Sequence, residues 1–216
     1  MKLYNCAKLT ERNSGVEAAI EAVKRGDLVV FPTDTVYGIG CDAFKSWSVS
    51  ALLRAKGRGR EVPPPVLVGS RRMLDGLVRD LTPAARDLVD AFWPGPLTVL
   101  VEYTQSLDWD LGETDGVIQV RMPMHPVALE LIRETGPMAV SSANKLDQEP
   151  AATAEKAQSQ FDYEVSVYLE AGPLSEQLTS TIVDCTGTVP KVLRTGGLSV
   201  EQLREITPEI EAEVEE

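Results

Sequence analysis

The chain has very little histidine and cysteine, which narrows the chemistry open to it. His125 is the only histidine, so a histidine-rich metal centre is excluded and a Ser-His-Asp triad would have to use that residue. The three cysteines, Cys6, Cys41 and Cys185, are far apart and form no CxxC pair. Isolated cysteines in odd number are typical of reduced thiols in a cytoplasm. We therefore expect a cytoplasmic protein without a dedicated metal site.

Long apolar runs are also missing. No stretch approaches the roughly 20 apolar residues that a membrane-spanning helix needs. The beginning, "MKLYNCAKLT", has no apolar segment like that of a secretory signal. The chain of 216 residues, 43% of them hydrophobic, is long enough for one substantial core. We expect one globular domain with no membrane contact.

Positive charge is scarce overall but concentrated in one place. The net charge of −12 argues against nonspecific nucleic-acid binding as the main task, because phosphate attraction depends on clustered cations. Residues 205–216 carry six acids and no base, so we expect a domain over residues 1–206 and an acidic, solvated tail over 207–216. By contrast, "RAKGRGR" at 54–60 holds four cations and no acid. An acidic protein has therefore kept one local cationic segment.

Hydrophobic periodicity and turn residues predict alternating helices and strands. Gly26 and Gly57 suit left-handed helix ends, and Thr82 followed by Pro83 suits a helix start. Helices are predicted at 16–26, 48–56, from 70, from 82, 126–135, 153–161 and 199–206. Strands are predicted at 27–31, 65–69, 97–103, 116–122, 137–143, 166–170, 180–185 and 191–194. This order predicts a single-domain α/β fold with a mixed sheet and flanking helices.

Polar side chains gather directly after the predicted strands, where open α/β sheets usually bind ligands. They are Thr33, Asp34, Thr35 and Tyr37; Lys56 and Arg58; Arg121, before "MPMHP"; Ser141, Ser142 and Asn144; and Ser180 and Arg194. Hydroxyls and amides supply directional hydrogen bonds, and two cations spaced around Gly57 can face one anion. The set suits a polyanionic substrate with an amino-acid-like part.

Each of these segments also has a plainer explanation. "PTDTVYG" could be a turn that bonds its own backbone, the basic segment a solvated face, and "SSAN" a helix cap or an Asx-turn. His125 fits a packed loop histidine better than a general base. The chain has no GxxxxGK[ST] phosphate loop, and "GIG" at 38–40 lacks the third glycine of a dinucleotide fingerprint. None of these motifs decides the function alone.

Taken in order, the motifs are more specific. "FPTDTVYGIGCDAF", "AKGRGR" followed by "PPPVLV", "FWPGPLTVLV", "VRMPMHP", "AVSSAN", "STIVDCTG" and "KVLRTGG" resemble the Sua5/YrdC/YciO family over nearly all of residues 14–197. The resemblance implies a twisted mixed sheet wrapped around a concave, electropositive cavity. It leaves no residues for the additional C-terminal domain of longer members.

The resemblance also implies residue roles. The KxR pair falls on Lys56 and Arg58, expected as the catalytic pair that holds the nucleotide phosphates. The SxN pair falls on Ser142 and Asn144, which with Arg194 are expected to bind ATP. Threonine binding is expected from Thr33, Thr35, Tyr37, Arg121 and Ser180, with Arg121 near the carboxylate.

Three positions depart from the family pattern. Leu67 stands where many relatives have histidine, Val62 where asparagine is frequent, and Val117 where threonine is common. These departures leave room for a paralogue of the same fold that acts on another carbamoyl substrate.

The resembling enzymes make L-threonylcarbamoyladenylate and pyrophosphate from L-threonine, bicarbonate and ATP, with Mg²⁺ carried by the nucleotide. Their product passes to a tRNA threonylcarbamoyl-transferase complex for N6-threonylcarbamoyladenosine modification of tRNA at position 37. We expect this nucleotidyltransferase activity here. The alternative from another class is an RNA-binding or ribosome-assembly protein, and weak RNA binding is compatible with either function. Binding through RNA phosphates would weaken steeply with salt, whereas binding of small ligands in a cavity would not.

Overall fold

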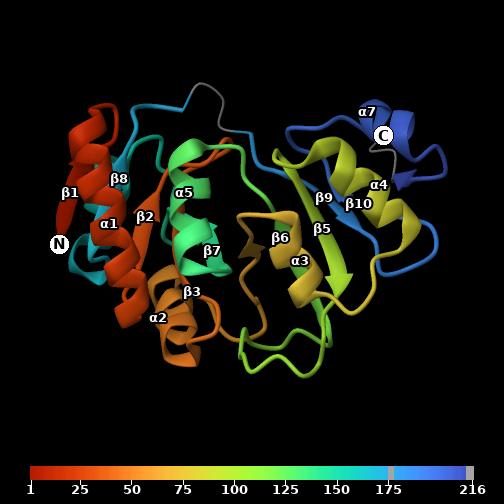
Figure 1. The fold of residues 1–216 in the computed structure, drawn as a ribbon, viewed down its shortest axis with the longest axis horizontal. Helices are drawn as coiled ribbons and strands as arrows, with labels where there is room; N and C mark the ends of the chain where they lie inside the picture. The colour runs from red at the N-terminus through yellow and green to blue at the C-terminus, as the bar shows by residue number, and fades with distance from the viewer. Residues whose placement is uncertain (175–177, 213–216) are drawn as a thin grey trace.

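The computed structural model describes residues 1–174 and 178–212, and their helices and strands alternate along the chain (Figure 1). The helices are α1 (Leu9–Arg25), α2 (Ser46–Lys56), α3 (Arg71–Leu77), α4 (Pro83–Phe92), α5 (Pro126–Thr135), α6 (Ala154–Phe161) and α7 (Val200–Ile206), with a 3-10 turn η1 (Asp162–Glu164). The strands are β1 (Lys2–Asn5), β2 (Val29–Phe31), β3 (Gly38–Asp42), β4 (Val66–Leu67), β5 (Leu97–Glu102), β6 (Val117–Arg121), β7 (Met138–Ser142), β8 (Val167–Glu170), β9 (Thr181–Asp184), β10 (Lys191–Arg194) and β11 (Glu211–Ala212).

These strands form one sheet in the order β1-β8-β2-β3-β7-β4-β6-β5-β9-β10-β11. Parallel pairs such as β4 with β6 and β5 with β9 alternate with antiparallel pairs such as β5 with β6 and β3 with β7. The predicted α/β class with a mixed sheet is therefore confirmed. Helix ends follow the sequence signals as well, because Ser70 and Thr82 cap α3 and α4 and Gly26 adopts a φ of 93° after α1.

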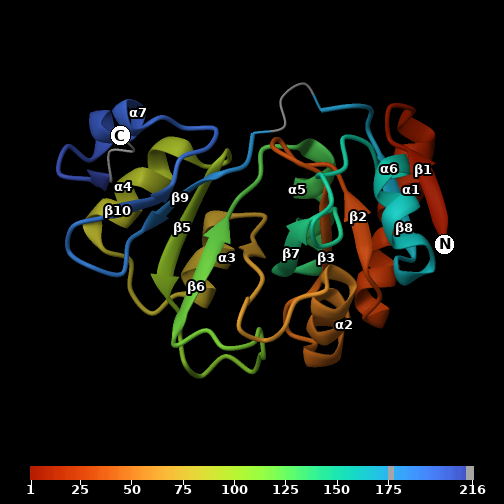
Figure 2. The same cartoon turned by 180° about the vertical axis from the view of Figure 1, so that it is seen from behind.

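Helices cover the two halves of the sheet unequally. In one half, α1 and α5 pack apolar side chains such as Ala19 and Leu131 against Phe31 of β2. In the other half, α3, α4 and α7 lie on one face of β5, β6, β9 and β10 (Figure 1). Seen from behind, β5, β6 and β9 have no described helix in front of them (Figure 2). That open face leaves room for a cavity.

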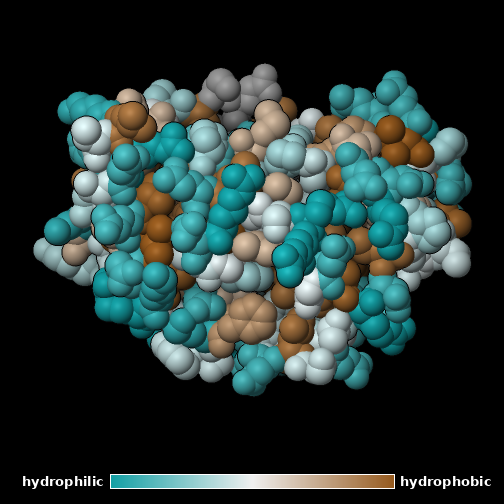
Figure 3. Space-filling model, viewed as in Figure 1, coloured by the Kyte–Doolittle hydropathy of each residue, from teal (hydrophilic) through white to brown (hydrophobic). Residues whose placement is uncertain are grey.

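The helix side of the molecule presents an ordinary surface. Viewed from that side, hydrophilic residues lie over the helices, with hydrophobic residues visible between them (Figure 3). Among the described residues, no helix combines the length and apolar character that crossing a membrane would require.

Strand β3 was not predicted, because glycine has a low strand propensity and "GIGCD" lacks the alternation of a half-buried strand. The structure explains the glycines by close packing. A Cβ on Gly40 would lie 2.8 Å from the Val140 side chain and 3.0 Å from the Ala139 carbonyl oxygen of neighbouring β7. Small residues here let β3 and β7 approach closely.

The segment predicted as an acidic tail is partly folded. Residues 211 and 212 pair with Lys191 and Val192 as the edge strand β11. Ile210 is 3% exposed and joins the main hydrophobic core. The prediction of a solvated tail from residue 207 is therefore wrong for these residues, because one apolar anchor and backbone pairing hold the acidic segment against the sheet. Residues 213–216 lie outside the described chain.

Candidate active site

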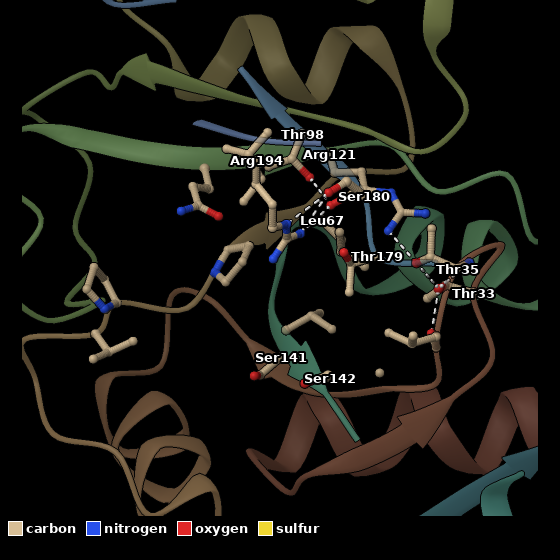
Figure 4. Close-up of a pocket in the computed structure, with 18 of the residues that line it drawn as sticks. Thr33, Thr35, Leu67, Thr98, Arg121, Ser141, Ser142, Thr179, Ser180 and Arg194 are labelled. Carbon is tan, nitrogen blue, oxygen red and sulfur yellow. Dashed lines mark hydrogen bonds between the residues drawn. The ribbon is translucent and has the colours of Figure 1, made fainter. Parts of the chain in front are cut away.

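A cavity of about 300 Å³ opens on the face of the sheet that the helices leave uncovered (Figure 4). Its lining comes from loop 33–38, from the loop before β4, and from strands on both sides. The lining residues are Thr33, Thr35, Val36, Gly38, Arg58, Val62, Pro63, Pro65, Leu67, Thr98, Gln119, Arg121, Val140, Ser141, Ser142, Thr179, Ser180, Ile182 and Arg194. Its three charged residues are all arginines.

One row of paired residues forms much of the cavity wall. Across β4, β6, β5, β9 and β10, the row runs Leu67, Arg121, Thr98, Ile182 and Arg194. Residues paired directly between neighbouring strands point to the same face, so all five project to the open side. The sheet register thereby places Arg121 and Arg194 in the same cavity.

The loop between β2 and β3 supplies two buried threonines. The Thr33 hydroxyl donates to the Val36 carbonyl oxygen at 2.6 Å and lies 3.1 Å from the Thr35 hydroxyl. The Thr35 N–H donates to the Thr33 hydroxyl at 3.2 Å. The segment is therefore a turn held by its own hydrogen bonds, and both of its threonines also line the cavity, where a ligand can reach them.

Arg121 is almost fully buried and makes three hydrogen bonds. Its Nε donates to Gly95 O at 3.0 Å, its Nη1 to Thr35 Oγ1 at 2.7 Å and its Nη2 to Asp34 Oδ1 at 2.7 Å. Burial lowers the Arg121 pKa, and the Asp34 carboxylate opposes that shift. A guanidinium has five N–H groups, so Nη1 and Nη2 each keep one donor for a ligand.

Asp34 links two segments of the site in a way that was not predicted from the sequence. Its Oδ1 accepts from Arg121 and from the Met124 N–H at 2.8 Å, so it joins the threonine loop to the "MPMHP" turn. The long separation between Asp34 and Arg121 hides this ion pair from any local pattern.

Arg194 reaches the cavity from β10 and contacts Ser180. Its Nη2 lies 2.8 Å from Ser180 O and 3.3 Å from Ser180 Oγ, while Ser180 Oγ is 2.8 Å from Thr98 Oγ1. Burial, together with the nearby charge of Arg121, lowers the Arg194 pKa. Within the described chain, no carboxylate forms an ion pair with Arg194. The side chain is therefore a cation available to an anionic ligand.

The predicted KxR pair divides between two environments. Arg58 lines the cavity, and no carboxylate in residues 1–174 or 178–212 pairs with it. Lys56 is 1% exposed, is not a lining residue, and bonds the turn at 142–144. The expectation that both face the phosphates together is not met in this arrangement, because Lys56 still belongs to α2 and Gly57 ends the helix between them. Arg60, by contrast, pairs with Asp110 at the surface.

The predicted SxN pair divides in the same way. Ser142 lines the cavity, whereas Asn144 is half-buried, is not a lining residue, and donates from Nδ2 to Gln148 O at 2.7 Å. Tyr37 is also absent from the lining, so the structure does not place it as a direct threonine contact. It is fully buried, with its hydroxyl 3.0 Å from Glu170 Oε1 and 2.8 Å from Gly172 O. Burial raises the Tyr37 pKa, so the phenol keeps its proton and can donate.

His125 lies outside the cavity lining, in agreement with the packed-loop interpretation. Its Nδ1 accepts from the Val127 N–H at 3.2 Å and caps α5. Burial lowers its pKa.

The cavity lining also includes residues that were not predicted and residues that depart from the family pattern. Thr98, Gln119 and Thr179 were not predicted, although Thr98 and Gln119 are polar residues inside apolar strands, which was a readable signal. Of the three departures from the family pattern, Val62 and Leu67 line the cavity and Val117 does not.

Comparison with known proteins identifies similar chains. A family model for Sua5, YciO and YrdC, described as "Telomere recombination", matches residues 21–196. A Mycobacterium tuberculosis (strain ATCC 25618 / H37Rv) protein named "Putative threonylcarbamoyl-AMP synthase" is 54% identical over 203 residues, which cover 94% of each chain. The threonylcarbamoyl-AMP synthase of Bacillus subtilis is 31% identical over 201 residues, 92% of this chain and 58% of that protein.

Solved structures agree with these matches. The structure of Pyrococcus abyssi Sua5 complexed with L-threonine aligns with a TM-score of 0.90 and 31% identity, over 98% of this chain and 62% of that one. Escherichia coli YciO aligns with a TM-score of 0.79 and 23% identity, over 89% of this chain and 93% of that one. This second likeness concerns the fold alone.

The burial of Tyr37 leads to a first prediction. Tyr37→Phe should lower the free energy of unfolding by about 1–3 kcal/mol, because Glu170 and the Ala171 N–H lose a buried partner. It should change threonine affinity by less than about threefold. Thr35→Val, which removes a hydroxyl from the cavity, should lower the affinity for threonine about 3- to 10-fold. Urea unfolding and calorimetry measure the two effects. If Tyr37→Phe instead had normal stability and greatly weakened threonine binding, Tyr37 would have to contact threonine directly.

Proposed function

Because the chain belongs to the Sua5/YciO/YrdC family, we propose that it makes threonylcarbamoyl-AMP and pyrophosphate from L-threonine, bicarbonate and ATP. It is a nucleotidyltransferase, and L-threonine is its amino-acid substrate. The relatives named above support this activity, and the most similar of them match over nearly their full length.

The observation that carries the proposal is the charge of the cavity. Arg58, Arg121 and Arg194 face it, and no acid stands among its lining residues, in a protein of net charge −12. Excess positive charge in a partly dry cavity favours an anionic ligand strongly, since Coulomb interactions strengthen as water is removed. A nucleoside triphosphate and an amino-acid carboxylate are such ligands.

The two ends of the cavity suit the two substrates. Thr33, Thr35 and the free donors of Arg121 offer hydroxyls and a fork-like guanidinium to the threonine hydroxyl and carboxylate. Arg58 and Arg194 are available for the phosphates, and Ser142 also lines the cavity. We assign the threonine end to the loop at 33–35 and the phosphate end to the two unpaired arginines.

In the reaction, the neutral threonine amine adds to carbon dioxide derived from bicarbonate, and water and a proton are released to solvent as the carbamate forms. A carbamate oxygen then forms a bond to the α-phosphorus of ATP, while the bond to the bridging oxygen breaks and pyrophosphate leaves with that electron pair. The chain must hold two anions together and neutralise the charge that develops on the phosphoryl oxygens. The carbamate is already anionic, so its attack on the α-phosphorus needs no general base.

Magnesium fits this scheme as part of the nucleotide. The cavity lining contains no carboxylate, and the described residues include no cluster of acids, histidines or cysteines that could hold a metal. A Mg²⁺ ion would take its ligands from the triphosphate and water, and would screen the phosphate charge. We further propose that the product passes to a tRNA threonylcarbamoyl-transferase complex, in the cytoplasm.

The activity itself is tested by pyrophosphate release. With ATP and Mg²⁺ present, we expect release only when threonine and bicarbonate are both added, because the carbamate is the nucleophile. Serine and glycine serve as control amino acids. Equal release without threonine would refute the assignment, and release with a different amine would indicate a paralogue, to which Leu67 and Val62 in the lining would then contribute.

The threonine end is tested at Arg121. Arg121→Ala should weaken threonine binding by about 10- to 150-fold, the loss expected for one charged hydrogen bond. This variant also leaves the half-buried Asp34 without its ion-pair partner, so Asp34→Asn/Arg121→Ala is the control for stability. Both variants should lose threonine affinity alike by calorimetry, and unchanged affinity in the double variant would show that the role is misassigned.

The phosphate end is tested by a matched pair of arginines from one loop. Arg58→Ala should lower the rate of pyrophosphate release at least about tenfold, because Arg58 faces the cavity without an acidic partner. Arg60→Ala should change it by less than about threefold, since Arg60 pairs with Asp110 at the surface. Similar, small and salt-sensitive losses in both variants would instead favour RNA binding through a general basic patch. Circular dichroism should confirm an intact fold in each.

A further inference from the structure

Lys56 lies at the end of α2, behind the cavity wall. Lys56 is 1% exposed, and its side chain is one of the largest that are fully buried in the described protein. Two residues later, Arg58 lines the cavity. Gly57 lies between them in the left-handed region, with a φ of 66°, where a non-glycine residue would be strained. The helix end thus directs one cation inward and the other outward.

The Lys56 ammonium is surrounded by oxygen atoms of a single turn. Its Nζ donates to Ser142 O at 2.6 Å, to Asn144 Oδ1 at 3.1 Å and, at close range, to Asn144 O. An ammonium group has three N–H donors and no acceptor. Ser142 Oγ, at 3.5 Å from Nζ, is a fourth oxygen, so the oxygens of the turn use all three donors and none is left for a phosphate.

The turn that Lys56 holds is itself part of the cavity wall. Ser141 and Ser142 line the cavity, and Ser142 pairs with Gly38 of β3 on its other side. Ser142 Oγ donates to Asn144 Oδ1 at 2.5 Å, which ties the serine to the same oxygen that Lys56 binds. Several partly negative oxygens converge at this turn, and a buried cation offsets their mutual repulsion.

We propose that Lys56 is a positioning residue that fixes the 142–144 turn from inside, with Asn144 as its partner, and that phosphate contact belongs to Arg58 and Arg194. This assignment rests on the proposed function only for the identity of the phosphate. It divides the two short motifs: Arg58 and Ser142 line the cavity, whereas Lys56 and Asn144 are not lining residues and bond each other.

Burial supports an internal role. Desolvation, together with the charge of Arg58, lowers the pKa of Lys56 to about 7. An ammonium whose charge burial disfavours is retained only where fixed oxygens compensate it, and the turn provides them.

The first test compares Lys56→Met with Arg58→Met as its matched control. Hydrogen exchange is measured without ligand on peptides covering 143–151, whose amides of Ala143 and Ala151 bond Tyr37 O and Ala143 O. Lys56→Met should speed this exchange at least about tenfold, because local opening becomes easier, and Arg58→Met should leave it unchanged. Inorganic tripolyphosphate should bind Lys56→Met within about threefold of the original protein and Arg58→Met at least about tenfold more weakly.

The second test uses the unaltered protein, in case Lys56→Met does not fold. Acetylation by an N-hydroxysuccinimide ester should modify Lys56 at least about tenfold more slowly than exposed Lys8, with ATP or without it, because a buried and bonded amine is unreactive. Rapid labelling of Lys56 that ATP suppresses would overturn the proposal. So would unchanged turn exchange in Lys56→Met together with a loss of tripolyphosphate binding equal to that of Arg58→Met. None of these readouts requires turnover, so they stand apart from the pyrophosphate assay.

Discussion

The buried guanidinium of Arg121 connects the parts of the chain that form the cavity. From the end of β6 it bonds the turn at Gly95, the hydroxyl of Thr35 and the carboxylate of Asp34. Removing one partner from such a buried pair is costly, because the other charge is then left without compensation. The same guanidinium keeps two N–H donors, which the proposed function assigns to the carboxylate of threonine, so one residue would both hold the loop at 33–35 in place and bind the substrate. Structural and functional demands on this position coincide.

Positive charge serves two distinct purposes around the cavity. Lys56 donates its hydrogen bonds to oxygen atoms of the chain itself, at the turn after β7. Arg58 and Arg194 have no acidic partner in the described residues and remain available to phosphates. The difference follows from side-chain chemistry, since a compact ammonium fits between converging carbonyl oxygens, whereas a planar guanidinium suits forked contact with an anion. An acidic protein can therefore bind a polyanion through a few well-placed cations.

Much of this arrangement could be predicted from the sequence. Helix caps such as Thr82 and the periodicity of α5 are local signals, and local signals determined most elements correctly. Of the expected site residues, the cavity contains Thr33, Thr35, Arg58, Arg121, Ser142, Ser180 and Arg194. Tyr37 and Lys56 are buried behind the wall, and the half-buried Asn144 is not a lining residue. Motif order shows which side chains follow a strand or a helix, but the direction of each depends on non-local partners such as Glu170 and the turn at 142–144. Strand β3 was not predicted, because its glycines are explained only by its close packing against β7, which no local pattern shows.

Two sets of cations lie at the cavity wall. Arg58 and Arg194 face the cavity and would bind the substrate phosphates, whereas Lys56 bonds the turn at 142–144 from inside the protein. A crystal structure with threonine and a non-hydrolysable ATP analogue tests this division most directly. Phosphate oxygens should lie within hydrogen-bond distance of the Arg58 and Arg194 guanidinium groups, at roughly 3 Å. Lys56 Nζ should still contact Ser142 O and Asn144 O, as in the free protein. A Lys56 ammonium bound to the triphosphate, with the turn at 142–144 released, would contradict this division.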